Sequence, residues 1–115
     1  MTAIMVPQKR QYSADFKGCG SERSFRLRVT HALGLKLSLI TAATDRKAFW
    51  HALCDWVTKG IVAKQNVHVR LTGIEELYDV CPESADTLFS ILREAKKSSH
   101  TFSADAVIGR RNWKI

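Results

Sequence analysis

The chain has 115 residues, 45 % of them hydrophobic and 25 % charged, which is the composition of one globular domain with one core and excludes a wholly disordered chain. No apolar run approaches the roughly 20 residues of a membrane-spanning helix, and the first ten residues lack the charged start and apolar block of a secretory signal. The excess of 18 Lys and Arg over 11 Asp and Glu gives a net charge of +7, which favours polyanions or acidic protein surfaces as partners rather than a membrane.

Residues 1–22 are predicted to form a flexible basic arm. They show no sustained hydrophobic period, and they contain Pro7, Gly18 and Gly20. This composition is usual for a disordered terminus. We therefore expect a single α+β domain over residues 23–105.

A β-hairpin is predicted at the start of this domain. Every second residue from 25 to 39 is apolar or histidine, which is the period of a strand: Phe25, Leu27, Val29, His31, Leu33, Leu35, Leu37 and Leu39. One strand of that length would be unusual in so small a domain. We place a three-residue loop at Ala32–Gly34, with Gly34 in the left-handed conformation that closes such loops.

The rest of the domain is predicted to contain three helices and one more strand. The first helix begins at an N-cap at Thr44 or Asp45 and ends at Gly60. A strand follows at 67–71, and a capping box of Thr72 and Glu75 begins a second helix that ends at Pro82. The third helix covers about 84–97, and residues 106–115 form either a short edge strand or a basic tail.

The predicted order is thus β-β-α-β-α-α. The fold class is α+β, with a small antiparallel sheet, made of the hairpin and at least one more strand, and about three helices on one face. Charge is divided along the chain, because residues 73–92 contain five acidic residues and no Lys or Arg. We expect the molecule to have a basic side and an acidic side.

Two groups of residues are candidates for binding a partner. The sheet face turned away from the helices would carry Arg26, Arg28, Lys36, His68 and Arg70. A rigid cationic face can follow a phosphate backbone, although an ordinary solvated face has the same composition and this one lacks aromatic residues for stacking on bases.

The second candidate group is Arg110, Arg111 and Trp113 near the C-terminus. Such residues clamp a nucleic acid through Arg–phosphate bonds and Trp stacking, or anchor in a groove of a protein. The alternative is that Trp113 folds back onto the core and leaves the charges in water.

No catalytic, metal or cofactor site is predicted, and we expect the chain not to be an enzyme. The four histidines and three cysteines lack the spacing of metal ligands, and the sequence has no P-loop or glycine-rich dinucleotide motif. Glu75 and Glu76 diverge by about 100° on a helix, so they do not form an acid–base pair. An odd number of cysteines without a CxxC pair indicates a reducing compartment, and we expect a cytoplasmic protein.

These observations predict a non-catalytic binding module that docks through a basic surface on nucleic acid or a nucleoprotein assembly. The alternative is a small regulator or inhibitor, of the accessory type found in phages and mobile elements, that occupies a site on a larger protein complex. A homodimer formed through an edge strand or the acidic helices is compatible with either.

Overall fold

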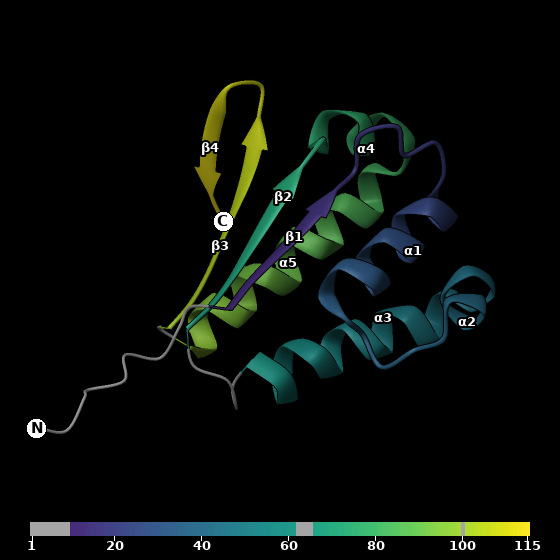
Figure 1. The fold of residues 1–115 in the computed structure, drawn as a ribbon, viewed down its shortest axis with the longest axis horizontal. Helices are drawn as coiled ribbons and strands as arrows, with labels where there is room; N and C mark the ends of the chain where they lie inside the picture. Colours follow the sequence, from purple (N-terminus) through teal and green to yellow (C-terminus); the bar gives the residue numbers. More distant parts are fainter. Residues whose placement is uncertain (1–9, 62–65, 100) are drawn as a thin grey trace, which may run out of the picture.

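The protein is a four-stranded sheet with helices packed on one face (Figure 1). The structure, a computed structural model, describes residues 10–61, 66–99 and 101–115. The strands are β1 (Arg10–Asp15), β2 (Val67–Thr72), β3 (Phe102–Ile108) and β4 (Arg111–Lys114). The helices are α1 (Glu22–Leu33), α2 (Leu39–Thr44), α3 (Arg46–Asp55), the π-helical turn η1 (Trp56–Ile61), α4 (Ile74–Val80) and α5 (Pro82–Ser98).

The sheet is mostly parallel, with the strands in the order β1-β2-β3-β4. β1 pairs with β2 and β2 with β3 in parallel, whereas β3 and β4 form an antiparallel hairpin. Helices connect each parallel pair, since a parallel pair needs a crossover, and Figure 1 shows α5 running behind β1 and β2. The general α+β class is confirmed, but the predicted antiparallel sheet, the three helices and the order β-β-α-β-α-α are wrong.

The predicted hairpin at residues 25–39 is replaced by helix α1 and the loop after it. The Ser21 side chain accepts a hydrogen bond from the amide of Ser24 at the start of the helix, and Gly34, with φ of 63°, ends it. Phe25, Val29 and Leu33 recur every four residues and are all buried. Because four is an even number, this helical stripe also falls on alternate residues, and the two periods coincide.

The structure also differs from the predicted arm at residues 10–22. Six of these residues form β1, and the side chains of Ala14 within the strand and of Phe16 and Cys19 beyond it are buried in the core. Residues 1–9 of the predicted arm lie outside the described residues. At the other end, residues 106–115 continue β3 and add β4 at the edge of the sheet.

The core lies between the helices and the inner side of the sheet. Alternation along β2 buries Val67, Val69 and Leu71, which pack in one cluster with residues of α1, α3 and α5. The predicted capping box is not formed, because the Thr72 hydroxyl donates to Asp15 and Gly73 precedes α4. In the described parts of the chain, no helix combines the length and apolar content needed to cross a bilayer.

Candidate binding surface

The outer face of the sheet, which we call the open face, does not form the predicted cationic platform. It carries Gln11, Ser13 and Asp15 of β1, His68, Arg70 and Thr72 of β2, Ser103, Asp105 and Val107 of β3, and Asn112 and Lys114 of β4. Only His68 and Arg70 of the five predicted residues lie here. Arg26 and Arg28 are on α1 and Lys36 is in the following loop, because the hairpin that would have placed them on the sheet is absent.

Arg26 instead joins two helices. Its side chain is buried, its Nε donates to the carbonyl of Ala42 at 2.8 Å, and its Nη2 donates to that of Ala43 at 2.9 Å. Its Nη1 also lies 3.3 Å from a carboxylate oxygen of Glu22. These contacts satisfy carbonyls near the end of α2, so the guanidinium is unavailable to an external phosphate.

Arg28 holds the segment between β1 and α1. Its Nη1 donates to the carbonyls of Asp15, at 3.0 Å, and Lys17, at 2.6 Å. Lys36 is exposed in the loop after α1. The structure therefore places Arg26, Arg28 and Lys36 in three different environments, all away from His68 and Arg70.

His68, Arg70, Ser103 and Asp105 form one hydrogen-bonded network across β2 and β3. The imidazole Nδ1 of His68 lies 2.6 Å from the Ser103 hydroxyl, and its Nε2 lies 3.2 Å from Asp105 Oδ1. Arg70 donates to both oxygens of Asp105, at 3.2 Å from Nε and 3.0 Å from Nη2. Hydrogen bonds from Arg70 hold the pKa of the Asp105 carboxyl below its usual value, although burial opposes them, and hydrogen bonding to Asp105 raises the pKa of Arg70.

A serine, a histidine and an aspartate in one hydrogen-bonded chain invite comparison with a catalytic triad. Here the aspartate is engaged by a bidentate arginine, which neutralises the charge that a triad uses to stabilise a protonated histidine. The three residues also stand in the central strands of a sheet, where they link β2 to β3. We interpret the network as a connection between strands.

The Asp105–Arg70 pair predicts a pH dependence of stability. A carboxyl group whose folded pKa is lowered stabilises the fold above its unfolded pKa, and this contribution is lost as the pH falls through the folded value. Asp105→Asn should therefore lose less unfolding free energy than the wild type between about pH 6 and about pH 3. Urea denaturation at both pH values measures this, and Asp79→Asn on the exposed side of α4 is the control.

Asp15 and Glu75 also have a lowered pKa, through hydrogen bonds from the amides of Lys17 and Gly109 respectively. Some acid sensitivity should therefore remain in Asp105→Asn. An acid-induced loss equal to that of the wild type would contradict the role given to Asp105.

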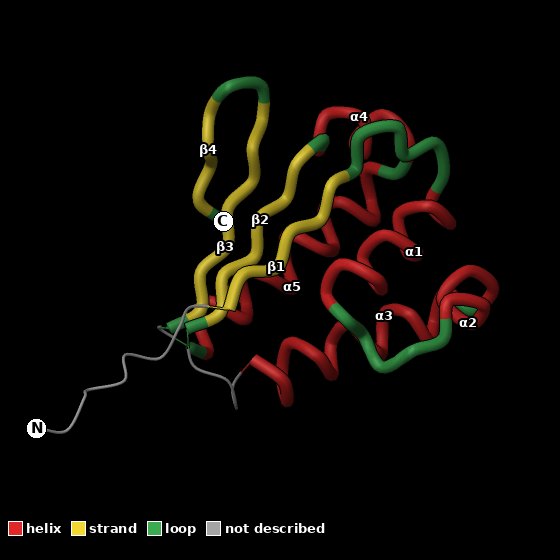
Figure 2. Tube along the Cα trace, in the orientation of Figure 1, coloured by secondary structure: helices red, strands yellow, loops and turns green. Residues whose placement is uncertain are grey.

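The β3–β4 hairpin extends from the edge of the sheet. Figure 2 shows it standing apart from α1, α2 and α3. Its turn contains Gly109, with φ of 64°, whose amide donates to Glu75 Oε1 at 2.5 Å. The neighbouring Glu76 accepts from the amide of Gly18, so the two glutamates of α4 bind different loops, as their divergence on the helix requires.

This hairpin carries exposed cations and one exposed tryptophan. Arg110 and all four residues of β4 are exposed, and Trp113 retains 52 % of its surface. Within the described ranges, Arg110, Arg111 and Lys114 form no salt bridge. The register places Trp113 opposite Ala106 on the helix side, and Lys114 opposite Asp105 on the open face.

Two further basic residues lie beside the predicted C-terminal group, and neither was among the predicted site residues. Lys114 belongs to the same strand and follows from alternation along it. Lys96 comes from α5, and its ammonium donates to the main-chain oxygen of Ile115 at 3.1 Å. No local sequence pattern predicts this contact, because it joins α5 to the residue that follows β4.

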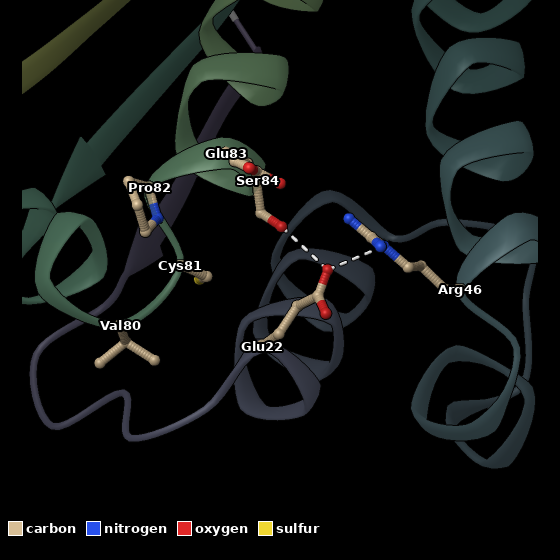
Figure 3. A pocket seen from close by; sticks show the side chains of 7 residues that line it. All are labelled: Glu22, Arg46, Val80, Cys81, Pro82, Glu83 and Ser84. Atoms are coloured by element: carbon tan, nitrogen blue, oxygen red, sulfur yellow. Dashed lines mark hydrogen bonds and ion pairs between the residues drawn. The ribbon is translucent and has the colours of Figure 1, made fainter.

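A pocket of about 310 Å³ opens between α1 and the start of α5. Figure 3 shows Ser84 and Arg46 converging on the Glu22 carboxylate, each at 2.9 Å from Oε1. The Glu22 carboxylate therefore already fills the position at the start of α5 where an anionic ligand would bind. Burial raises the pKa of the Cys81 thiol beside it, which disfavours the nucleophilic thiolate.

No group of three or more His, Cys, Asp or Glu side chains is placed to hold a metal ion in the parts that the structure describes. The chain matches no protein-family model, no curated protein and no solved structure.

Proposed function

We propose that this protein is a non-catalytic binding module that docks on nucleic acid through the β3–β4 hairpin. The observation that carries the proposal is the combination of Arg110, Arg111 and Lys114, none in a salt bridge with a described residue, with an exposed Trp113 on one projecting element.

The charge of this element supports a polyanion as its partner. Arginine and lysine that contact phosphates release condensed counterions, and this release supplies most of the sequence-independent affinity for nucleic acid. The net charge of +7 also accelerates the encounter with a negatively charged polymer. Acidic helix α4 contacts this element at its turn, where Glu75 accepts from the amide of Gly109, while the neighbouring Glu76 binds the amide of Gly18 instead.

Replacing both arginines tests the proposal. Arg110→Ala with Arg111→Ala should weaken binding to an oligonucleotide by about 10-fold or more and reduce the log–log salt slope by about 2, because two phosphate contacts are lost. Fluorescence anisotropy across a salt series measures both quantities.

The matched control is Arg23→Ala with Lys47→Ala, which removes the same charge from exposed positions on α1 and α3. It should leave the salt slope unchanged. Equal losses in the two double variants would show that net charge alone causes binding, and would contradict docking through the hairpin.

One observation favours the alternative function as a regulator of a larger protein. Leu39 and Ile40 stand side by side at the start of α2 with 52 % and 79 % of their surface exposed. Exposed apolar groups of this kind are typical of protein contacts. If the chain bound no nucleic acid, Leu39→Ser with Ile40→Ser would be the first variant to test in a search for a protein partner.

The two edge strands bear on whether the chain forms a homodimer. β1 and β4 each pair with one neighbour within the described sheet, so each has one free edge. Free edges can pair with another chain. Dimerisation stays a prediction, and sedimentation at several concentrations tests it.

A further inference from the structure

We infer that the nucleic acid bound by the hairpin is single-stranded and that Trp113 stacks on an unpaired base. This inference rests on the proposed function and names the form of nucleic acid that the surface accepts. Its basis is the arrangement of Trp113 between cations that come from two different elements.

Trp113 differs from the other two tryptophans of the chain. Trp50 packs against Phe25 and Phe49, with ring centroids 5.9 and 4.9 Å apart, and Trp56 packs edge-on against Tyr12 at 5.2 Å. Among the described aromatic side chains, none forms a ring pair with Trp113. Its indole is therefore open to an external ring.

Cations flank this indole on the helix side of β4. Arg111 precedes Trp113 by two residues and therefore lies on the same side of the strand. Ile115 follows by two residues, packs against the core on that side, and its main-chain oxygen binds the Lys96 ammonium. Arg111, Trp113 and Lys96 thus form a track along about 13 Å of strand.

Two acidic groups on the helices beside this track have partners of their own. Glu94 precedes Lys96 on α5 and pairs with Lys97 at 3.3 Å. Glu75 binds the turn at Gly109, at the far end of β4 from Lys96. The track itself therefore keeps a positive charge.

An aromatic ring between cations suits a single strand better than a duplex. Proteins that bind single strands combine a positive groove for the backbone with aromatic side chains on which bases stack. In a duplex the bases are stacked on one another. The arginines and lysines can still reach the phosphates, but an indole on the side of a strand finds no exposed base on which to stack. Because the track holds one aromatic residue, it accepts one base by stacking.

The test compares one oligonucleotide sequence as single-stranded DNA, single-stranded RNA and duplex DNA, with binding followed by anisotropy and tryptophan fluorescence. The wild type should bind a single-stranded form at least about 10-fold more tightly than the duplex, with quenching of fluorescence. Trp113→Ala should weaken single-strand binding by about 10-fold and leave duplex binding unchanged.

Trp113→Phe is the matched variant, because it keeps a ring for stacking but removes the fluorophore. It should retain most of the affinity and lose the quenching, since Trp50 and Trp56 are packed against other rings. Preference for DNA or for RNA is compatible with the inference.

Equal affinity for single strands and duplex, with no effect of Trp113→Ala, would overturn this inference and leave the proposed function in place. No binding to any of the three oligonucleotides would overturn both.

Discussion

Replacing Gly73 with alanine should destabilise the fold by about 2–4 kcal/mol, through left-handed strain and steric overlap together. Gly73 links β2 to α4 with φ of 70°. A Cβ atom there would lie 2.4 Å from the amide nitrogen of Lys17 and 2.8 Å from the carbonyl carbon of Phe16. These are main-chain atoms held by hydrogen bonds of the same segment to Arg28 and Glu76, so they cannot easily withdraw.

Two other glycines separate the contributions to this loss. Gly109→Ala introduces a Cβ at φ of 64° with no atom within 4 Å, so it measures left-handed strain of about 1–2 kcal/mol. Gly20→Ala meets nothing within 4 Å and has no positive φ, and it should change stability little. Urea denaturation of the three variants would contradict this explanation if Gly73→Ala were no more destabilising than Gly109→Ala.

The second large loss of unfolding free energy is expected for Arg26→Ala, at about 2–4 kcal/mol. The substitution removes a buried hydrogen-bond donor and leaves its acceptors unsatisfied. The carbonyls of Ala42 and Ala43 would be left without the guanidinium, and Glu22 would lose one of its partners. Only 8 % of the Arg26 surface is exposed, so water does not readily replace it.

Arg23→Ala on the exposed side of the same helix is the control, and it should change the unfolding free energy by no more than about 0.5 kcal/mol. Chemical denaturation measures both variants. Similar losses would contradict the structural role of Arg26. If Arg26→Ala stayed fully folded yet bound nucleic acid poorly, Arg26 would regain the role that the sequence suggested for it.

The elements with a single unambiguous period were predictable from the sequence. Alternation at Val67, Val69 and Leu71 predicted β2, and the spacing of Leu88 and Leu92 predicted α5. Residues 25–33 were misassigned because a four-residue helical stripe also satisfies alternation. The left-handed Gly34 did not resolve the ambiguity, since this conformation closes a hairpin loop and ends a helix equally well.

The sheet topology depended on a strand that carries little signal. β1 has six residues, and of these only Ala14 is fully buried. β2 pairs in parallel with β1 on one side and with β3 on the other. Neither β1 nor the start of β3 was predicted, so an antiparallel arrangement with the predicted hairpin looked sufficient. The prediction of a basic sheet face was wrong for the same reason as the hairpin, because Arg26 and Arg28 lie on helix α1.

The residues of the C-terminal group could be named from the sequence, but their arrangement in space could not be predicted. Arg110, Arg111 and Trp113 were candidates because charge and an aromatic ring occur together there. The pairing of β4 with β3 places Trp113 on the side of Arg111 and away from Lys114. Lys96 joins them only through the packing of α5 against the end of the sheet.

The most direct test of docking through the hairpin is to map amide chemical-shift changes on the protein while a single-stranded oligonucleotide is added. The largest changes should fall on residues 109–115 and around Lys96, with α2 unaffected. Changes centred on Leu39 and Ile40, or spread evenly over all exposed lysines and arginines, would contradict it.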